Sequence, residues 1–166
     1  MVSHPERKHR GHLIEKSQGG DTVASHDNKA SVARFYDEVL NQRKVDLIND
    51  LAIEDYVEHD PFPGQGNGRA DLKARVQLLL SAFDPLRFTV DEVIEEGDKT
   101  VVRWTNAGTH SGNFLGIPAT NKTFSVAGID IHVMRDGRMA EHRHVIDMLG
   151  QMQQLGLIPG PDGGSR

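Results

Sequence analysis

Residues 123–147 read TFSVAGIDIHVMRDGRMAEHRHVID, and this stretch decides the fold. Its two halves alternate apolar and polar side chains, as β-strands do, and they flank the dipeptide Asp136–Gly137. Asp-Gly is among the strongest short signals for a two-residue hairpin loop, because both loop positions need a positive φ. The stretch therefore predicts an antiparallel hairpin with strands at 123–133 and 138–147.

The same turn predicts which side chains face each other across the hairpin. If Arg135 pairs with Arg138, His132 lies opposite Glu141, and directly opposed residues share a sheet face. One face then carries the ionisable residues Asp130, His132, Glu141, Arg143 and Asp147. The other face carries Ile129, Ile131, Val133, Ala140, His142, His144 and Ile146. A slip of one residue in the hairpin would undo this pairing.

The rest of the chain places helices before this hairpin and a second hairpin beside it. Apolar residues recur at helical spacing in 28–41, 45–51 and 68–83, and a last short helix is expected at 148–156. Residues 55–64 form a brief extended segment. Residues 86–110 contain two alternating runs around a turn in which Gly97 supplies a positive φ. Helices followed by a long antiparallel meander predict an α+β fold, with the helices on one face of a curved sheet.

The ionisable face of the hairpin has two interpretations. Carboxylates, an arginine and a histidine side by side are what general acid–base chemistry needs, but an ordinary solvated face looks the same. On the other face, His142 and His144 could bind a metal, yet the sequence offers no obvious third ligand there, so we expect no metal site. Trp104, the only tryptophan, either lines a pocket or fills the core.

Composition predicts one domain with a tail at each end. A chain of 166 residues is long enough for one core and too short for two ordinary domains. We expect the domain at 28–158, a flexible tail at 1–27 and a loose C-terminal tail at 159–166, because the tails are poor in large apolar residues. The four histidines of the first tail lack the spacing of metal ligands.

Charge and residue usage argue against several kinds of partner. The net charge is -5 and the basic residues are scattered, which disfavours nucleic-acid binding. The chain contains no cysteine, so disulfides and thiol chemistry are excluded. It has no apolar run of membrane-spanning length, and its start lacks the apolar core of a secretory signal. We expect a cytoplasmic protein without nucleic-acid or membrane partners.

Three segments carry a resemblance to a known family: ARFYDEVLNQRKVDLINDLAIEDYVEHDP (33–61), VVRWTNAGTHSGNFLGIPAT (101–120) and GIDIHVMRDGRMAEHRHVIDMLGQMQQLG (128–156). Over residues 29–156 the chain resembles the SnoaL-like polyketide cyclases, or ester cyclases, of the NTF2-like superfamily. The resemblance implies a cone, in which a strongly curved antiparallel sheet wraps around about three helices and leaves one hydrophobic pocket.

The resemblance also implies a chemistry. Family cyclases close a ring of a polyketide intermediate by intramolecular aldol condensation without a cofactor, using a pocket aspartate as general acid–base and a nearby histidine. It assigns the aspartate role to Asp147, and we pair His132 with it because the predicted register puts both on one face. The expected substrate is a small hydrophobic carbonyl compound. The remaining pocket residues expected are His59, Trp104, His110, Asp130 and Arg143. The superfamily commonly forms homodimers through the outer sheet face, so a homodimer is expected. Ile129, Ile131 and Val133 either supply its apolar surface or face the helices.

Other functions stay open. NTF2-like epoxide hydrolases use an Asp, Arg, Asp arrangement, and Arg143 beside Asp130 and Asp147 suggests one. A ketosteroid-type isomerase would use the same enolate chemistry, and a non-catalytic ligand-binding protein is a further alternative. Two departures from the family leave the substrate open: ATNK follows LGIP where the family has a sequence close to PTG, and Arg143 stands where an aromatic residue is common.

Overall fold

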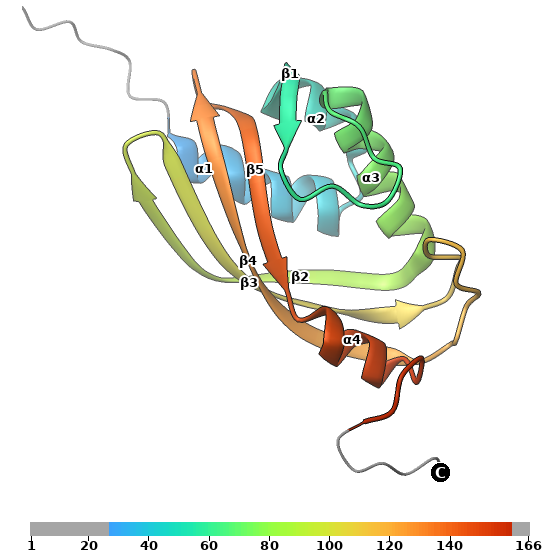
Figure 1. Ribbon diagram of the computed structural model, residues 1–166. Helices are drawn as coiled ribbons and strands as arrows, with labels where there is room; N and C mark the ends of the chain where they lie inside the picture. Colours follow the sequence, from blue (N-terminus) through green and yellow to red (C-terminus); the bar gives the residue numbers. More distant parts are fainter. Residues whose placement is uncertain (1–26, 161–166) are drawn as a thin grey trace, which may run out of the picture.

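The computed structural model describes residues 27–160 (Figure 1). The expected N-terminal tail lies outside this range except for Asp27, and so does the C-terminal tail from residue 161 onward. In chain order the elements are α1 (Asn28–Arg34), η1 (Phe35–Asn41), η2 (Val45–Leu47), α2 (Ile48–Leu51), β1 (Ala52–Glu58), α3 (Arg69–Ala82), β2 (Phe83–Glu96), β3 (Lys99–His110), β4 (Thr123–Arg135), β5 (Arg138–Ile146) and α4 (Met148–Gln154).

The first helical region follows the apolar pattern of the sequence. The Asp27 carboxylate caps α1 by accepting a 2.9 Å hydrogen bond from the backbone of Ala30. The chain then continues as the π-helical turn η1. The predicted stripe is buried in the core: Val32, Phe35, Tyr36, Val39 and Leu40. The predicted helix at 28–41 is therefore confirmed.

Five strands form one curved, open sheet in the order β1-β5-β4-β3-β2, and α1, α2 and α3 lie on one side of it (Figure 1). Strands β2 to β5 form the predicted antiparallel meander, and both hairpin turns have the expected positive φ, at Gly97, Asp136 and Gly137. Strand β1 pairs in parallel with β5, which the sequence did not predict. The α+β fold is confirmed.

The predicted register of the β4–β5 hairpin is wrong. Arg135 pairs with Arg138 as expected, but the pairing then shifts by one residue at Ala140, so His132 faces His142 instead of Glu141. Met139 and Ala140 are both 1% exposed. Two consecutive inward side chains cannot occur in a regular strand, where side chains alternate, so the extra residue forms a bulge. The bulge turns Glu141 and Arg143 outward and brings His142 and His144 onto the face of Asp130 and His132.

No helix within residues 27–160 is long and apolar enough to cross a membrane.

Candidate active site

A cavity of about 70 Å³ lies between the helices and the sheet. Its walls come from elements far apart in the sequence, and most of them are apolar. The apolar lining consists of Phe35, Leu40, Tyr56, Phe62, Leu72, Val76, Leu79, Phe83, Phe88, Trp104, Phe114, Ile146 and Met148. The polar lining consists of Arg75, Asn106, Asp130, His132, His142, His144 and Gln151. The volume is several times the roughly 10–15 Å³ that one water needs, so the cavity can admit a ligand group.

Three histidines form a row across the polar wall. His132 on β4 and His142 on β5 are directly opposed, and their rings stack with centroids 4.8 Å apart. His142 and His144 lie two residues apart on β5, so they share a face, and their rings stack at 5.2 Å. His132 and His142 are 1% and 5% exposed. The row depends on the bulge, because a regular hairpin would put His132 on the opposite face from the other two.

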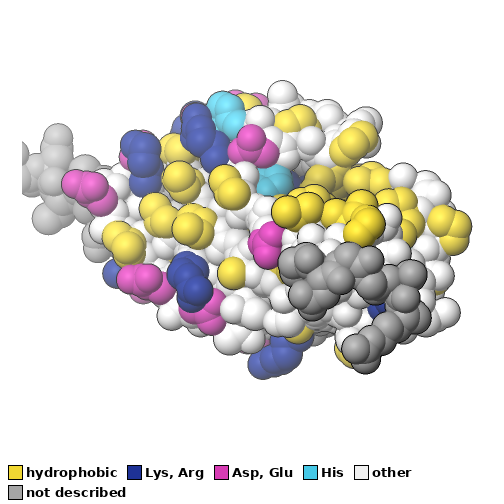
Figure 2. All heavy atoms as spheres, turned by 60° about the horizontal axis from the view of Figure 1, so that its bottom comes forward, with side chains coloured by type: hydrophobic (Ala, Val, Ile, Leu, Met, Phe, Trp, Pro, Cys, Tyr) yellow, Lys and Arg dark blue, Asp and Glu magenta, His cyan; other side chains and the backbone are white. Residues whose placement is uncertain are grey.

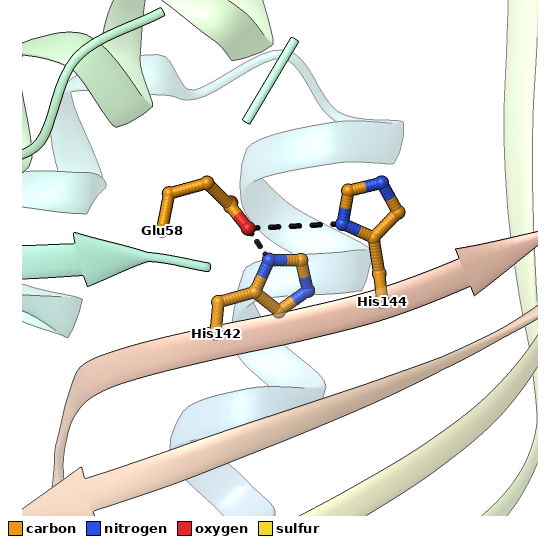
Figure 3. A group of neighbouring side chains, drawn as sticks. All are labelled: Glu58, His142 and His144. Atoms are coloured by element: carbon orange, nitrogen blue, oxygen red, sulfur yellow. Dashed lines mark hydrogen bonds and ion pairs between the residues drawn. The ribbon is translucent and has the colours of Figure 1, made fainter. Parts of the chain in front are cut away.

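Glu58, the last residue of β1, holds two of these histidines in place (Figure 3). It is paired with His142 by the parallel β1–β5 contact. His142 Nδ1 lies 2.9 Å from Glu58 Oε2, and His144 Nδ1 lies 3.7 Å from Oε1. Arg75 of α3 completes the group with a salt bridge from Nη1 to Glu58 Oε2, and its guanidinium also lies over the Phe62 ring. The Glu58 side chain is fully buried, so its charge is balanced within the protein.

Asp130 lies on the other side of His142. The Tyr36 hydroxyl, from η1, donates a hydrogen bond to Asp130 Oδ2 and also lies 3.3 Å from His132 Nε2. His142 Nε2 is 3.5 Å from Asp130 Oδ2, close enough for an ion pair. This Nε2 has no hydrogen-bond partner among the described residues. His142 therefore stands between two carboxylates, hydrogen-bonded to Glu58 and facing Asp130 across a slightly longer gap.

The partners of the two carboxyl groups keep them ionised. Burial alone would raise both pKa values, but the surrounding donors and positive charges reverse the shift. The pKa of Glu58 lies well below its usual value because of its contacts with His142 and His144 and the charge of Arg75. The pKa of Asp130 is held low by its contact with His142, the nearby His132 and the Tyr36 hydrogen bond. Both are carboxylates at neutral pH.

The two central histidines shift in opposite directions. Burial, together with the charge of His142, lowers the pKa of His132 to about 3, so His132 is neutral at pH 7. Burial also opposes a charge on His142, but Asp130 and Glu58 outweigh it and raise the pKa of His142. The wall thus offers, within one small space, a carboxylate, a neutral imidazole and a second imidazole whose surroundings favour its charged form.

The family of the chain follows from comparison with known proteins. The family model of SnoaL-like polyketide cyclases matches residues 30–155. The chain belongs to this family. It is 34% identical over 136 residues to aklanonic acid methyl ester cyclase DauD of Streptomyces sp. (strain C5), covering 76% of this chain and 81% of the relative. It is 33% identical over 135 residues to aklanonic acid methyl ester cyclase DnrD of Streptomyces peucetius, covering 76% and 90%.

A solved structure agrees with this assignment. TsrD from Streptomyces laurentii superposes on this SnoaL-like chain with a TM-score of 0.70 and 32% identity, covering 78% of this chain and 98% of TsrD. The NTF2-like cone expected from the resemblance is therefore the fold of this chain.

Of the residues expected in the SnoaL-like pocket, the structure places Trp104, Asp130 and His132 in the cavity wall. Three others lie outside the described lining. His59 is bonded to Glu141 at 2.8 Å on the surface, and Arg143 lies 3.3 Å from the same carboxylate. His110 is buried, with its Nδ1 3.2 Å from the Thr120 hydroxyl and its ring against Phe83.

The expected position of Asp147 on the pocket face with His132 is wrong. Asp147 is exposed and caps α4, where its carboxylate accepts a 2.8 Å hydrogen bond from the backbone of Gly150. Its own backbone donates to the carbonyl of Ala127, which lies at the end of the β4–β5 ladder. The physical reason is again the bulge, since the shift that brings His142 opposite His132 also takes Asp147 out of the predicted register.

Glu58 and Arg75 belong to this site although the sequence did not predict them there. A local signal existed for Arg75, because it stands three residues after Leu72 and four before Leu79, on the apolar face of α3. Glu58 gave no comparable signal, since its position depends on a parallel pairing with His142, 84 residues further along the chain.

Two overlapping groups of side chains have the residue types of a metal site. They are Glu58, His142 and His144, and Asp130, His132 and His142; within each group the ligand atoms all lie within 4.8 Å of one another. The sequence predicted no third ligand beside His142 and His144. In the structure, Asp130 and His132 lie beside His142 because of the observed strand pairing, and Glu58 comes from β1.

Proposed function

We propose that this chain closes a ring in a small hydrophobic, polyketide-like ester by intramolecular aldol condensation, with Asp130 as the general base. Two relatives that are 34% and 33% identical to this chain over the aligned residues are named as aklanonic acid methyl ester cyclases, which supports a methyl ester of this kind as substrate. The apolar walls suit an aromatic ligand. Asp130 is the one aspartate in the described lining of the cavity, which supports its choice as the base.

The observation that carries this proposal is the contact between Asp130 and His142 at the cavity wall. Asp130 takes a proton from the carbon next to a substrate carbonyl, and the electron pair left behind forms an enolate. The negative charge thereby moves from Asp130 to the substrate but stays beside His142, which can donate a hydrogen bond to it. The net charge of the pocket is unchanged in this step, so little reorganisation is needed.

Ring closure then follows within the same wall. The enolate carbon attacks a ketone carbon of the same molecule, a carbon–carbon bond forms, and the ketone oxygen takes a proton from His142 to become a hydroxyl. The proton on Asp130 returns to His142, so no atom is gained or lost. Holding the two carbons together in a shaped pocket supplies much of the rate enhancement, since the reaction is intramolecular.

The test is turnover of aklanonic acid methyl ester by Asp130→Asn beside Asp147→Asn. The amide keeps the shape of Asp130 but cannot accept the proton, so we expect turnover to fall at least about 100-fold. Exchange of the substrate's α-proton in deuterium oxide should fall with it. Asp147→Asn should keep wild-type turnover, because Asp147 lies at the helix cap. Full turnover in Asp130→Asn would overturn the proposal. If turnover is lost only in Asp147→Asn, Asp147 is the general base instead.

The alternative of epoxide hydrolysis has less support. The Asp, Arg, Asp arrangement expected from the sequence is not formed in the described chain, because Arg143 faces outward and contacts Glu141. Label from ¹⁸O-water in the product would nevertheless favour a hydrolase, whereas a shifted double bond without ring closure would favour an isomerase. Tight binding of the ester with neither reaction would favour a binding protein.

We also propose a homodimer through the outer face of the sheet. Figure 2 shows hydrophobic side chains lying between charged ones on one face of the molecule. Ile129 and Val145, which pair across β4 and β5, are 46% and 75% exposed. Light scattering at micromolar concentration should give twice the mass of one chain, and a monomer would overturn this proposal. The cytoplasmic location stays a prediction.

A further inference from the structure

We propose that the polar wall of the cavity binds a divalent transition-metal ion of the Zn²⁺ class, with Asp130, His132 and His142 as its ligands. Two imidazoles and one carboxylate, with the remaining positions open to a cavity, form a common ligand set for Zn²⁺ and related ions. All three side chains are buried, at 7%, 1% and 5% exposure, and all three line the cavity.

The His142 ring is oriented with one nitrogen free to bind an ion. Its Nδ1 is engaged by Glu58 at 2.9 Å, which leaves Nε2 as the free nitrogen on the side of Asp130. Nε2 is buried and has no hydrogen-bond partner within residues 27–160. Histidines that bind metals usually donate their other ring nitrogen to a carboxylate in this way, which fixes the ring and raises its basicity. Arg75 in turn fixes Glu58, so this support is itself held in place.

The ligand atoms also lie close to the spacing of a zinc site. In a tetrahedral zinc site with bonds of about 2.0–2.1 Å, ligand atoms lie roughly 3.3 Å apart. His142 Nε2 and Asp130 Oδ2 are 3.5 Å apart, so an ion can sit between them with little movement. The atoms of the full group lie within 4.8 Å of one another, so binding requires the His132 ring to move toward the ion. His132 Nδ1 has no hydrogen-bond partner in the described chain, so the movement disturbs the 3.3 Å contact of His132 Nε2 with the Tyr36 hydroxyl but no contact at Nδ1.

The neighbouring group of Glu58, His142 and His144 is less suitable. The guanidinium of Arg75 already contacts Glu58 Oε2, so a cation there would have to displace a buried positive charge or lie beside it. On the Asp130 side the nearest neighbour is the Tyr36 hydroxyl, which is neutral. The charge distribution therefore favours Asp130, His132 and His142.

This inference does not rest on the proposed ring closure. The ion would take the place of the proton at His142 Nε2 and would occupy Asp130, so Zn²⁺ should inhibit any reaction that uses these two groups. Metal binding is measured without substrate, so failure of one proposal leaves the other standing.

The experiment titrates chelator-treated, full-length protein with Co²⁺ and records its visible absorption. We expect one equivalent to give the intense bands of a four- or five-coordinate ion, and Zn²⁺ to abolish them. The bands should be lost in His132→Gln and Asp130→Asn and kept in His144→Gln. The histidines of the N-terminal segment are present in every variant, so they cannot produce this difference. Only weak six-coordinate absorption in the wild type, or loss in His144→Gln with retention in the other two variants, would overturn the proposal.

A measurement on the wild type guards against variants that fail to fold. Zn²⁺ should shift the ring ¹⁵N resonances of His132 and His142 at the ligating nitrogen, and should raise the unfolding temperature of the wild type, because the three ligands come together only in the folded chain. Unchanged resonances for these two rings at saturating Zn²⁺ would contradict the site.

Discussion

The two faces of the β4–β5 hairpin differ in what they bury: ionisable side chains are buried on one face, whereas the other exposes aliphatic side chains beside Glu141 and Arg143. The face toward the cavity buries ionisable residues, including Asp130 and His142, at 7% and 5% exposure. The outer face exposes aliphatic residues, with Val145 at 75%. Buried charges are stable only when paired, and their partners come from η1, β1 and α3. The inner face thus holds its charges through partners from neighbouring elements, whereas the outer face leaves aliphatic side chains in solvent.

The largest effect should come from removing the buried carboxylate that supports the inner face. Glu58→Ala leaves Arg75 and His142 without their shared partner, and breaking such a buried pair costs about 3–5 kcal/mol. The matched control is Glu141→Ala on the outer face, which also removes a histidine contact but at a solvent-exposed site. Urea unfolding should show a large loss for Glu58→Ala and little change for Glu141→Ala. Equal losses would mean that the two faces do not differ in this way.

The next effect concerns packing on the inner face. Gly128 lies under the Trp104 ring, which an added Cβ would overlap. Gly128→Ala should therefore cost about 1–3 kcal/mol, as overpacking usually does. Ala127→Val adds bulk one residue earlier, on the exposed side of β4, and should change the free energy of unfolding much less. An unchanged free energy of unfolding in Gly128→Ala would indicate that Trp104 is not held against β4.

The contrast between the faces also explains what the sequence could and could not predict. Alternation along each strand correctly grouped Asp130 with His132, and His142 with His144, because side-chain direction is a local property. The predicted pairing of residues between β4 and β5 was wrong because one bulged residue, Ala140, shifts every pair that follows it along β5. Local patterns do not reveal a bulge, since its position depends on how Met139 and Ala140 fit the core.

Long-range pairing set a second limit. Glu58 reaches the site only through the parallel contact of β1 with β5, and Arg75 only because α3 packs beside β1. By contrast, the helices and both hairpin turns were predictable from apolar spacing and from Asp136, Gly137 and Gly97, whose backbone angles are set by local chemistry. The elements could be predicted; the composition of the site could not.

A smaller effect is expected at the end of the hairpin. Asp147→Ala removes the N-cap of α4 and should cost about 1 kcal/mol of stability. Asp147→Ser, which can still cap the helix, should recover most of that loss. Turnover should stay near the wild-type value in both, because the side chain does not reach the cavity. A turnover loss that Ser does not restore would contradict the position of Asp147 outside the site.

The smallest effect should occur on the outer face. Val145→Thr should change the free energy of unfolding of the single chain by no more than about 0.5 kcal/mol, since the side chain is mostly in solvent. Val126→Thr, which places a hydroxyl at a 4% exposed position of β4, should cost clearly more. If Val145→Thr destabilises the protein only at concentrations where it dimerises, the outer face is the interface; a similar loss in both variants at all concentrations would contradict the distinction between the faces.

The most direct test of the account is a crystal structure of the protein with aklanonic acid methyl ester bound to the Asp130→Asn variant. The account predicts a one-residue bulge at Ala140, His132 opposite His142, and a substrate carbonyl within hydrogen-bonding distance of His142 and next to residue 130. A regular hairpin with His132 opposite Glu141, or a ligand held by Asp147 and Arg143 instead, would contradict it.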